Sequence, residues 1–186
     1  MKKIFVIAIA SLMALSASAQ KIGRVNFNEL VMLMPEMDAA RETIAASQKE
    51  AEETYAAMVE EYQGKVSQYQ QKNASWTAAI KESKEKELYD IQNRIQEFQQ
   101  NISQELQQQQ SQLMAPINEK AGNAVKEIAK AKGIDVLLDS SQAIYFSDAV
   151  VDLTAEARKA LGIAEGRTLE SLQAELAAQA QATQQQ

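Results

Sequence analysis

The sequence contains neither cysteine nor histidine among its 186 residues. Without cysteine, no disulfide can hold the fold and no thiol can act as a nucleophile. Without histidine, the commonest general base and metal ligand are both missing, so Ser–His and Cys–His nucleophile pairs are impossible and structural zinc is disfavoured. Carboxylate pairs remain as candidates for acid–base chemistry, and we expect neither a metal nor a cofactor.

Glycine, proline and aromatic residues are also scarce. The chain has six glycines, two prolines and 5% aromatic residues, whereas 24% of its residues are charged. With its many glutamines and alanines, this composition favours long helices. The formal net charge of −6 becomes −8 if Lys2 and Lys3 are removed with a signal peptide. An acidic chain is a poor candidate for binding nucleic acid or an anionic membrane surface.

Residues 1–19 have the features of a signal peptide. Two lysines precede an apolar stretch, Ile4 to Leu15, that is too short to cross a bilayer as a helix. Ala17-Ser18-Ala19 supplies the small residues that a signal peptidase accepts. No cysteine follows, which excludes a lipoprotein, and no later segment is apolar enough to span a membrane. We expect cleavage after Ala19 and an exported, periplasmic chain.

From Glu36 to about Lys132 the sequence has almost no helix breaker, and its apolar residues recur at intervals of three and four. This spacing predicts amphipathic helices with a coiled-coil-like seam. The stripe is narrow, and glutamines fill it between Leu106 and Leu113, so we expect loose packing. The seam members are Ala40, Ile44, Ala51, Tyr55, Met58, Tyr62, Val66 and Tyr69, then Leu88, Ile91, Ile95, Phe98, Ile102, Leu106, Leu113, Ile117, Ala121, Ala124 and Ile128.

One continuous helix of this span would be about 140 Å long, whereas a hairpin lets each half bury its stripe against the other. We expect the tip within residues 72–84, at Asn73-Ala74-Ser75, with Ser75 capping the second helix. Pro116 should mark the place where the arm joins a base, and Gly133 should end the helix.

The flanking segments predict a small β-containing base. Lys21 to Val25 reads as a strand, followed by a short helix that Pro35 ends. Ile134–Asp139 and Ala143–Phe146 predict a β-hairpin around Ser140-Ser141-Gln142. We expect a short helix from Thr154 to Leu161 closed by Gly162, another after Thr168, and disorder in the final Ala/Gln residues.

The order of these parts resembles the Skp (OmpH-like) family of periplasmic chaperones, over about Lys21 to Ile163. The resemblance is carried by several segments in sequence: Lys21-Ile22-Gly23-Arg24-Val25-Asn26, Pro35-Glu36, Leu113-Met114-Ala115-Pro116-Ile117, Val136-Leu137-Leu138-Asp139-Ser140-Ser141, and Asp152-Leu153-Thr154 to Leu161-Gly162-Ile163.

The resemblance implies a mainly α fold with a small β body, in which three chains form a jellyfish-like homotrimer. The body would comprise residues 20–35 and 117–163, the arm residues 36–116, and the tail residues 164–186. Unfolded outer-membrane β-barrel proteins would be held between the arms without ATP. By position, the trimer body would contain Ile22, Val25, Val136, Leu138, Ile144 and Phe146. The best-known members are strongly basic, whereas this chain is acidic.

Tyr55, Tyr62, Tyr69 and Trp76 recur every seventh residue along the first helix. They could form an adaptable apolar surface for unfolded clients, or pack in the seam against residues such as Phe98 and Ile102. We favour packing for the three tyrosines and leave Trp76 open.

Lysines gather near the expected tip. Lys72, Lys81 and Lys84 are candidates for client contact or for a weak membrane-surface contact. The alternative is a solvated end with weak ion pairs.

Glu52/Glu53 and Glu60/Glu61 are the tight carboxylate pairs of the first helix. On an extended arm they should be solvated, so we expect no enzyme. The leading hypothesis is a trimeric holdase, and the alternative is a non-catalytic periplasmic scaffold or spacer.

Overall fold

The computed structural model describes residues 20–184, so the expected signal peptide lies outside the described part. The chain divides into two compact units, one formed by residues up to Pro35 and from Asn118 onward, the other by Glu36–Ile117. Each division lies beside one of the two prolines. Pro35 is the first residue of a helix, where its missing N–H costs little, whereas Pro116 removes a hydrogen bond inside one.

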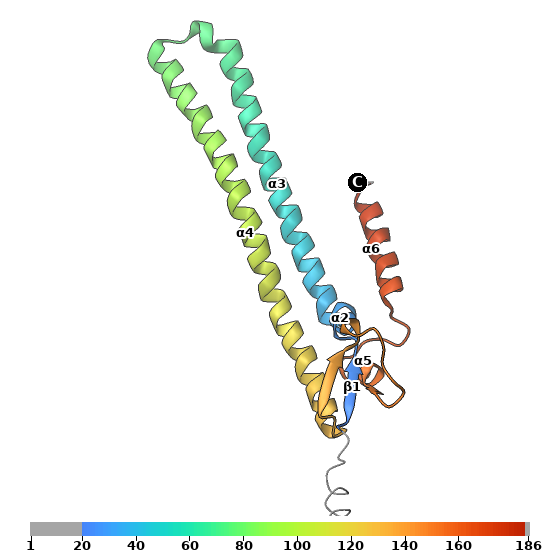
Figure 1. The fold of residues 1–186 in the computed structure, drawn as a ribbon. Coiled ribbons are helices and arrows are strands. Elements are labelled where there is room, and N and C mark those ends of the chain that lie inside the picture. Colours follow the sequence, from blue (N-terminus) through green and yellow to red (C-terminus); the bar gives the residue numbers. More distant parts are fainter. Residues whose placement is uncertain (1–19, 185–186) are drawn as a thin grey trace, which may run out of the picture. The chain divides into compact units, whose positions relative to one another are not determined.

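The unit Glu36–Ile117 is a helical hairpin. Helix α3 (Pro35–Lys72) and helix α4 (Ala78–Ala131) run antiparallel and side by side in Figure 1, joined by a 3₁₀ turn, η1 (Asn73–Ser75). The expected hairpin and the expected turn at Asn73-Ala74-Ser75 are therefore confirmed.

The predicted cap of α4 is wrong by two residues. Ser75 lies inside the turn, and its hydroxyl donates to the Lys72 carbonyl at 2.8 Å, which satisfies the end of α3 instead. Thr77 precedes α4, where its hydroxyl accepts from the Ile80 N–H at 3.4 Å.

The seam between α3 and α4 is thin, as the narrow stripe predicted. In the described residues of this unit the buried apolar side chains are Ala40, Ile91 and Ile117. Ile80 and Tyr89 keep 43% and 63% of their surface exposed. Hydrophobic burial therefore holds the hairpin together at a few points.

The other unit contains a three-stranded sheet in the order β2-β1-β3, formed by β1 (Ile22–Val25), β2 (Val136–Asp139) and β3 (Val151–Asp152). Both neighbours run parallel to β1, with Ile22 opposite Val136 and Gly23 opposite Val151. A side chain at Gly23 would approach Ile134 within 3.0 Å, so the close contact needs glycine.

The predicted β-hairpin is wrong, because Ala143–Phe146 forms no strand. The Asp139 carboxylate accepts from the Ser141 N–H at 2.8 Å and begins a 3₁₀ turn, η2 (Ser140–Gln142), that leads the chain away from β2. The chain instead reaches the far edge of β1, where Arg24 pairs with Asp152 at 2.9 Å.

Three shorter helices complete this unit: α2 (Phe27–Leu33), α5 (Thr154–Ala160) and α6 (Leu169–Gln184). The Asn26 side chain caps α2 by accepting from the Glu29 N–H at 3.2 Å. Helices α5 and α6 both contact α2. The core side chains with no more than 3% exposure in these helices and the residues that flank them are Leu30, Leu33, Met34, Leu153, Ala157, Leu161 and Leu172.

Helix α4 ends as predicted. Gly133 has a φ of +64°, and the N–H groups of Gly133 and Ile134 donate to the carbonyls of Lys130 and Ala129 at 3.0 and 2.9 Å. This is the Schellman arrangement, which satisfies the last carbonyls of a helix and favours glycine.

The helix expected after Thr168 is present as α6, and it continues through Gln184, into the Ala/Gln residues for which disorder was expected. Thr168 and Ser171 cap it reciprocally, each accepting the other's backbone N–H at 3.0–3.1 Å. Alanine and glutamine are also good helix formers. Within residues 20–184, no helix combines the length and apolar character needed to cross a membrane.

Candidate functional site

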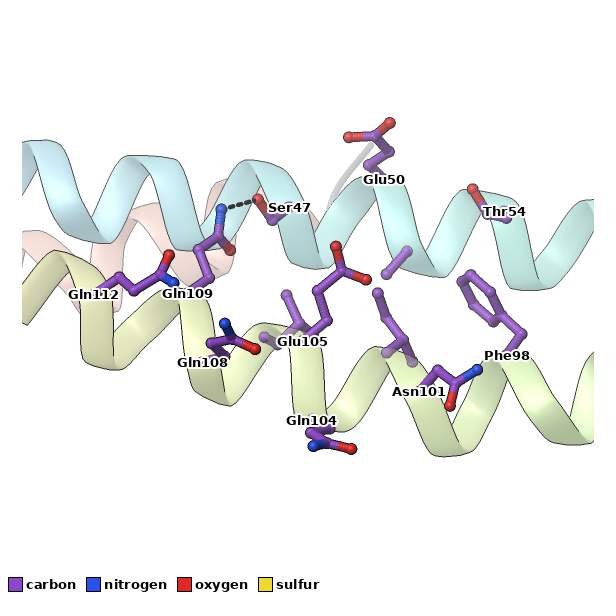
Figure 2. A pocket seen from close by; sticks show the side chains of 13 residues that line it. Ser47, Glu50, Thr54, Phe98, Asn101, Gln104, Glu105, Gln108, Gln109 and Gln112 are labelled. Carbon is purple, nitrogen blue, oxygen red and sulfur yellow. Dashed lines mark hydrogen bonds between the residues drawn. The ribbon is translucent and has the colours of Figure 1, made fainter.

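An open groove of about 720 Å³ lies between the middle portions of α3 and α4. Its apolar floor is formed by Ala51, Phe98, Ile102 and Leu106. Figure 2 shows that Phe98 extends from α4 toward α3 and that Glu105 also points toward α3. The polar rim consists of Ser47, Glu50, Thr54, Asn101, Gln104, Glu105, Gln108, Gln109 and Gln112.

A second groove, of about 570 Å³, shares this floor. It adds Tyr55 and Gln48 from α3 and Ser103 from α4. Ala51 lines both grooves, and its methyl group is too small to fill the space opposite Phe98, Ile102 and Leu106. The apolar side chains of the seam can therefore be reached at two openings.

Polar contacts hold the helices together around this opening. Gln109 donates to the Ser47 hydroxyl at 2.9 Å at one end of the groove, as the dashed line in Figure 2 marks. Nearer the tip, Arg94 pairs with Glu61 and Lys65 pairs with Glu87. The arm is thus held by polar contacts between the helices as well as by its thin seam.

Glu87 is the most perturbed carboxylate of the arm. It accepts hydrogen bonds from Lys65 and from Lys84, the latter at 2.8 Å, and these hold its pKa at about 2, below its ordinary 4.5. The same contact with Glu87 raises the pKa of Lys65. Because these side chains are accessible to water, the cluster stabilises the tip only modestly.

Tyr69 and Trp76 meet near the tip. Their ring centroids are 5.7 Å apart at an interplanar angle of 67°, an edge-to-face contact. The Tyr69 hydroxyl donates to Glu85, which raises the pKa of Tyr69. Trp76, left open by its sequence position, therefore has an aromatic partner within its own arm.

The other predicted contact residues vary in exposure. Tyr62 is half-buried, whereas Tyr55 is 37% exposed and lines the second groove. Lys72 is exposed, and Lys81 is partly exposed. Lys84 forms an ion pair with Glu87. The structure brings Tyr69 and Trp76 together but does not gather all these residues into one site.

Of the six predicted body residues, Val25 alone belongs to the buried core, at 3% exposure. Val136 and Leu138 are 40% and 41% exposed on β2, which is an edge strand of the sheet. Ile144 is fully exposed. Ile22 is half-buried, and Phe146 stacks with Arg24, whose Cζ lies 5.3 Å from the ring centroid.

The carboxylate pairs of α3 lie on its exposed surface. Glu53 is 3.9 Å from Lys49, and Glu61 pairs with Arg94. Among residues 20–184, no group of three or more acidic side chains is placed to hold a metal ion.

The polar rim of the groove was missed by sequence reasoning. Its signal was the run of glutamines between Leu106 and Leu113, which interrupts the apolar stripe. The run marks the level of the interruption on α4, but it does not reveal that Ala51 faces it from α3.

No curated protein shows significant sequence similarity to this chain. Among solved structures, the fold is similar to a candidate outer membrane chaperone (OmpH-like) from Caulobacter crescentus CB15, with a TM-score of 0.69 and 13% sequence identity. The match covers 78% of this chain and 86% of the other. The sequence model of the family described as outer membrane protein (OmpH-like) matches residues 21–161. Since this match covers most of the sequence, the chain belongs to the OmpH-like family.

Proposed function

We propose that the protein is an ATP-independent periplasmic holdase that binds unfolded outer-membrane β-barrel proteins and prevents their aggregation before insertion. The observation that carries the proposal is the open seam of the arm in a chain of the OmpH-like family. Its apolar residues Phe98, Ile102 and Leu106 line open grooves instead of a closed core. A surface of this kind offers many weak apolar contacts, as retention without catalysis requires.

Assembly into a homotrimer is part of this proposal. Val136 and Leu138 on an edge strand, together with Ile144, expose apolar surface in the unit that contains the sheet. An edge strand with exposed apolar side chains is a ready site for pairing with another chain. Three copies would then place three arms around one client, so that weak contacts add through multivalency.

The acidic composition is compatible with this function. The lysines near the tip, such as Lys72 and Lys81, offer a locally basic surface on an acidic chain. We assign them a weak contact with clients or with a membrane surface, screened by salt at physiological ionic strength.

The test is client aggregation followed by light scattering. A urea-unfolded outer-membrane barrel protein is diluted into buffer with increasing amounts of the chain from Gln20 onward. We expect scattering to be suppressed and the effect to saturate at about three chains per client, since one trimer would hold one client. Full scattering at every ratio, from a folded preparation, would reject the holdase and leave the spacer as the better interpretation.

A further inference from the structure

The two grooves of the arm have the features of a binding site for extended chain. Both have the same apolar floor, Ala51, Phe98, Ile102 and Leu106, and both have polar rims. The rim of the larger groove is rich in carboxamides, including Gln108, which both donate and accept hydrogen bonds. Such groups can bind a peptide backbone without regard to its sequence, while the floor receives apolar side chains.

The length of the larger groove limits what it can hold. Its lining residues on α4 run from Phe98 to Gln112, a rise of about 20 Å along the helix. An extended chain advances about 3.3 Å per residue, so about six residues fit. In such a segment alternate side chains point in opposite directions, and one set can enter the floor while the other meets the rim.

The charges that line the grooves limit further which client segments can bind. The lining of the larger groove includes Glu105, which points toward α3 in Figure 2, and Glu50, which extends from α3 away from α4. The smaller groove is lined by Glu52. Neither lining includes a lysine or an arginine. A positively charged side chain beside the apolar ones would therefore be favoured over a negatively charged one.

We propose that the mid-arm groove between α3 and α4 binds an extended client segment of about six residues, with apolar residues at alternate positions and a lysine or arginine among the others. This inference rests on the proposed holdase function and deepens it, because it places one client contact between the two helices of a single arm. Transmembrane β-strands alternate in the required way.

Site-specific crosslinking tests whether the client segment binds at the groove. Because the chain has no cysteine, Gln108→Cys gives one attachment site for a benzophenone at the rim. Ala57→Cys is the matched control on the same arm, exposed and outside both groove linings. The probe is a soluble peptide of about ten residues in which valine alternates with threonine and two threonines are replaced by lysine. We expect crosslinks at position 108 and few at position 57, whereas equal crosslinking would overturn the proposal.

A substitution that fills the groove tests whether the apolar floor binds the client segment. Ala51→Leu places a larger side chain opposite Ile102, and we expect it to weaken peptide binding about tenfold, measured by fluorescence anisotropy. Ala57→Leu adds the same atoms elsewhere and should leave binding unchanged. Unchanged binding by Ala51→Leu would overturn the proposal.

Charge provides a test that does not disturb packing. The lysine peptide should bind several-fold more tightly than its glutamate counterpart at low salt. The Glu50→Gln/Glu105→Gln variant should reduce the ratio between the affinities for the lysine and glutamate peptides. A ratio that these substitutions leave unchanged would contradict the assigned charge contacts. The groove is judged by these peptide measurements, whereas the holdase function is judged by aggregation in the presence of the unaltered chain.

Discussion

Single side chains decide where the arm is closed and where it is open. Ile91 is 4% exposed. Elsewhere along the seam, Ala51 of α3 and residues of α4 such as Phe98 and Ile102 line two open grooves. The methyl group of Ala51 cannot fill the space that a larger side chain would fill. A seam of this composition remains accessible without any conformational change.

At Gly133, the backbone conformation sets the cost of a substitution. Its φ of +64° is left-handed, and no atom would obstruct an added Cβ. Gly133→Ala should therefore lower the free energy of unfolding by about 1 kcal/mol through backbone strain alone. Gly64→Ala, in the interior of α3 and equally unobstructed, should instead raise it by about 0.5–1 kcal/mol. Thermal unfolding followed by circular dichroism checks both signs, and a loss in both variants would contradict this account.

The lowered pKa of Glu87 predicts how the stability of the arm changes at acidic pH. Since its folded pKa of about 2 is below the ordinary 4.5, its contribution to stability is present above pH 4.5 and is lost as pH falls toward 2. Lys65, whose pKa is raised, loses its part of the pair only as pH rises through that raised value.

Carbon-detected NMR of the Glu87 carboxyl group should give a midpoint near 2. Lys65→Met should move this midpoint upward, because it removes the largest cause of the shift. Lys72→Met changes a lysine of the same region that is exposed and serves as the control. A midpoint that stays in place after Lys65→Met would show that the ion pair does not form in solution.

At the scale of elements, α6 is attached to its unit by its first turns. Leu172 is 3% exposed, whereas Leu176, one helical turn later, is 40% exposed. Arg158 reinforces the attachment by donating to Glu29 at 3.1 Å and to the Arg167 carbonyl. Helix α6 lies beyond residue 161, where the family match ends.

We expect Leu172→Ala to destabilise the chain by about 2–3 kcal/mol, because it leaves a cavity beside α2. Leu176→Ala should cost less than about 1 kcal/mol, since its side chain is already partly in water. Urea unfolding of both variants measures the difference. If Leu176→Ala is equally costly, then α6 buries a second face in the assembled protein.

The elements that depend on neighbouring residues could be predicted from the sequence. Pro35 and Gly133 set helix ends through backbone geometry and local hydrogen bonds, and both were predicted to lie at a boundary. The sheet could not be predicted in this way. At its second edge, β1 pairs with β3, and the ion pair between Arg24 and Asp152 joins residues that are far apart in the sequence.

The groove illustrates the same limit. The glutamine run on α4 was visible in the sequence, but the opposing Ala51 looked like an ordinary member of the seam. The register between two helices decides which residues face each other, and periodicity does not specify that register.

At the scale of the whole molecule, the two units should have separable roles. The unit with the sheet contains the exposed edge residues Val136 and Leu138, and it includes the buried core around Leu30 and Leu153. The unit Glu36–Ile117 contains the grooves and few buried side chains. Assembly and client binding would then depend on different parts of one chain.

Deletion of Tyr55 to Ile102, with the helices rejoined by a short turn, tests this division. The variant keeps every residue of the unit with the sheet, and we expect it to form the same oligomer by analytical ultracentrifugation. It removes the floor residues Phe98 and Ile102 together with the whole tip, and we expect it to lose protection of an unfolded barrel protein. Undiminished protection would show that clients bind outside the arms. A monomeric variant would show that the arms themselves drive assembly, and the exposed edge of β2 would then need another explanation.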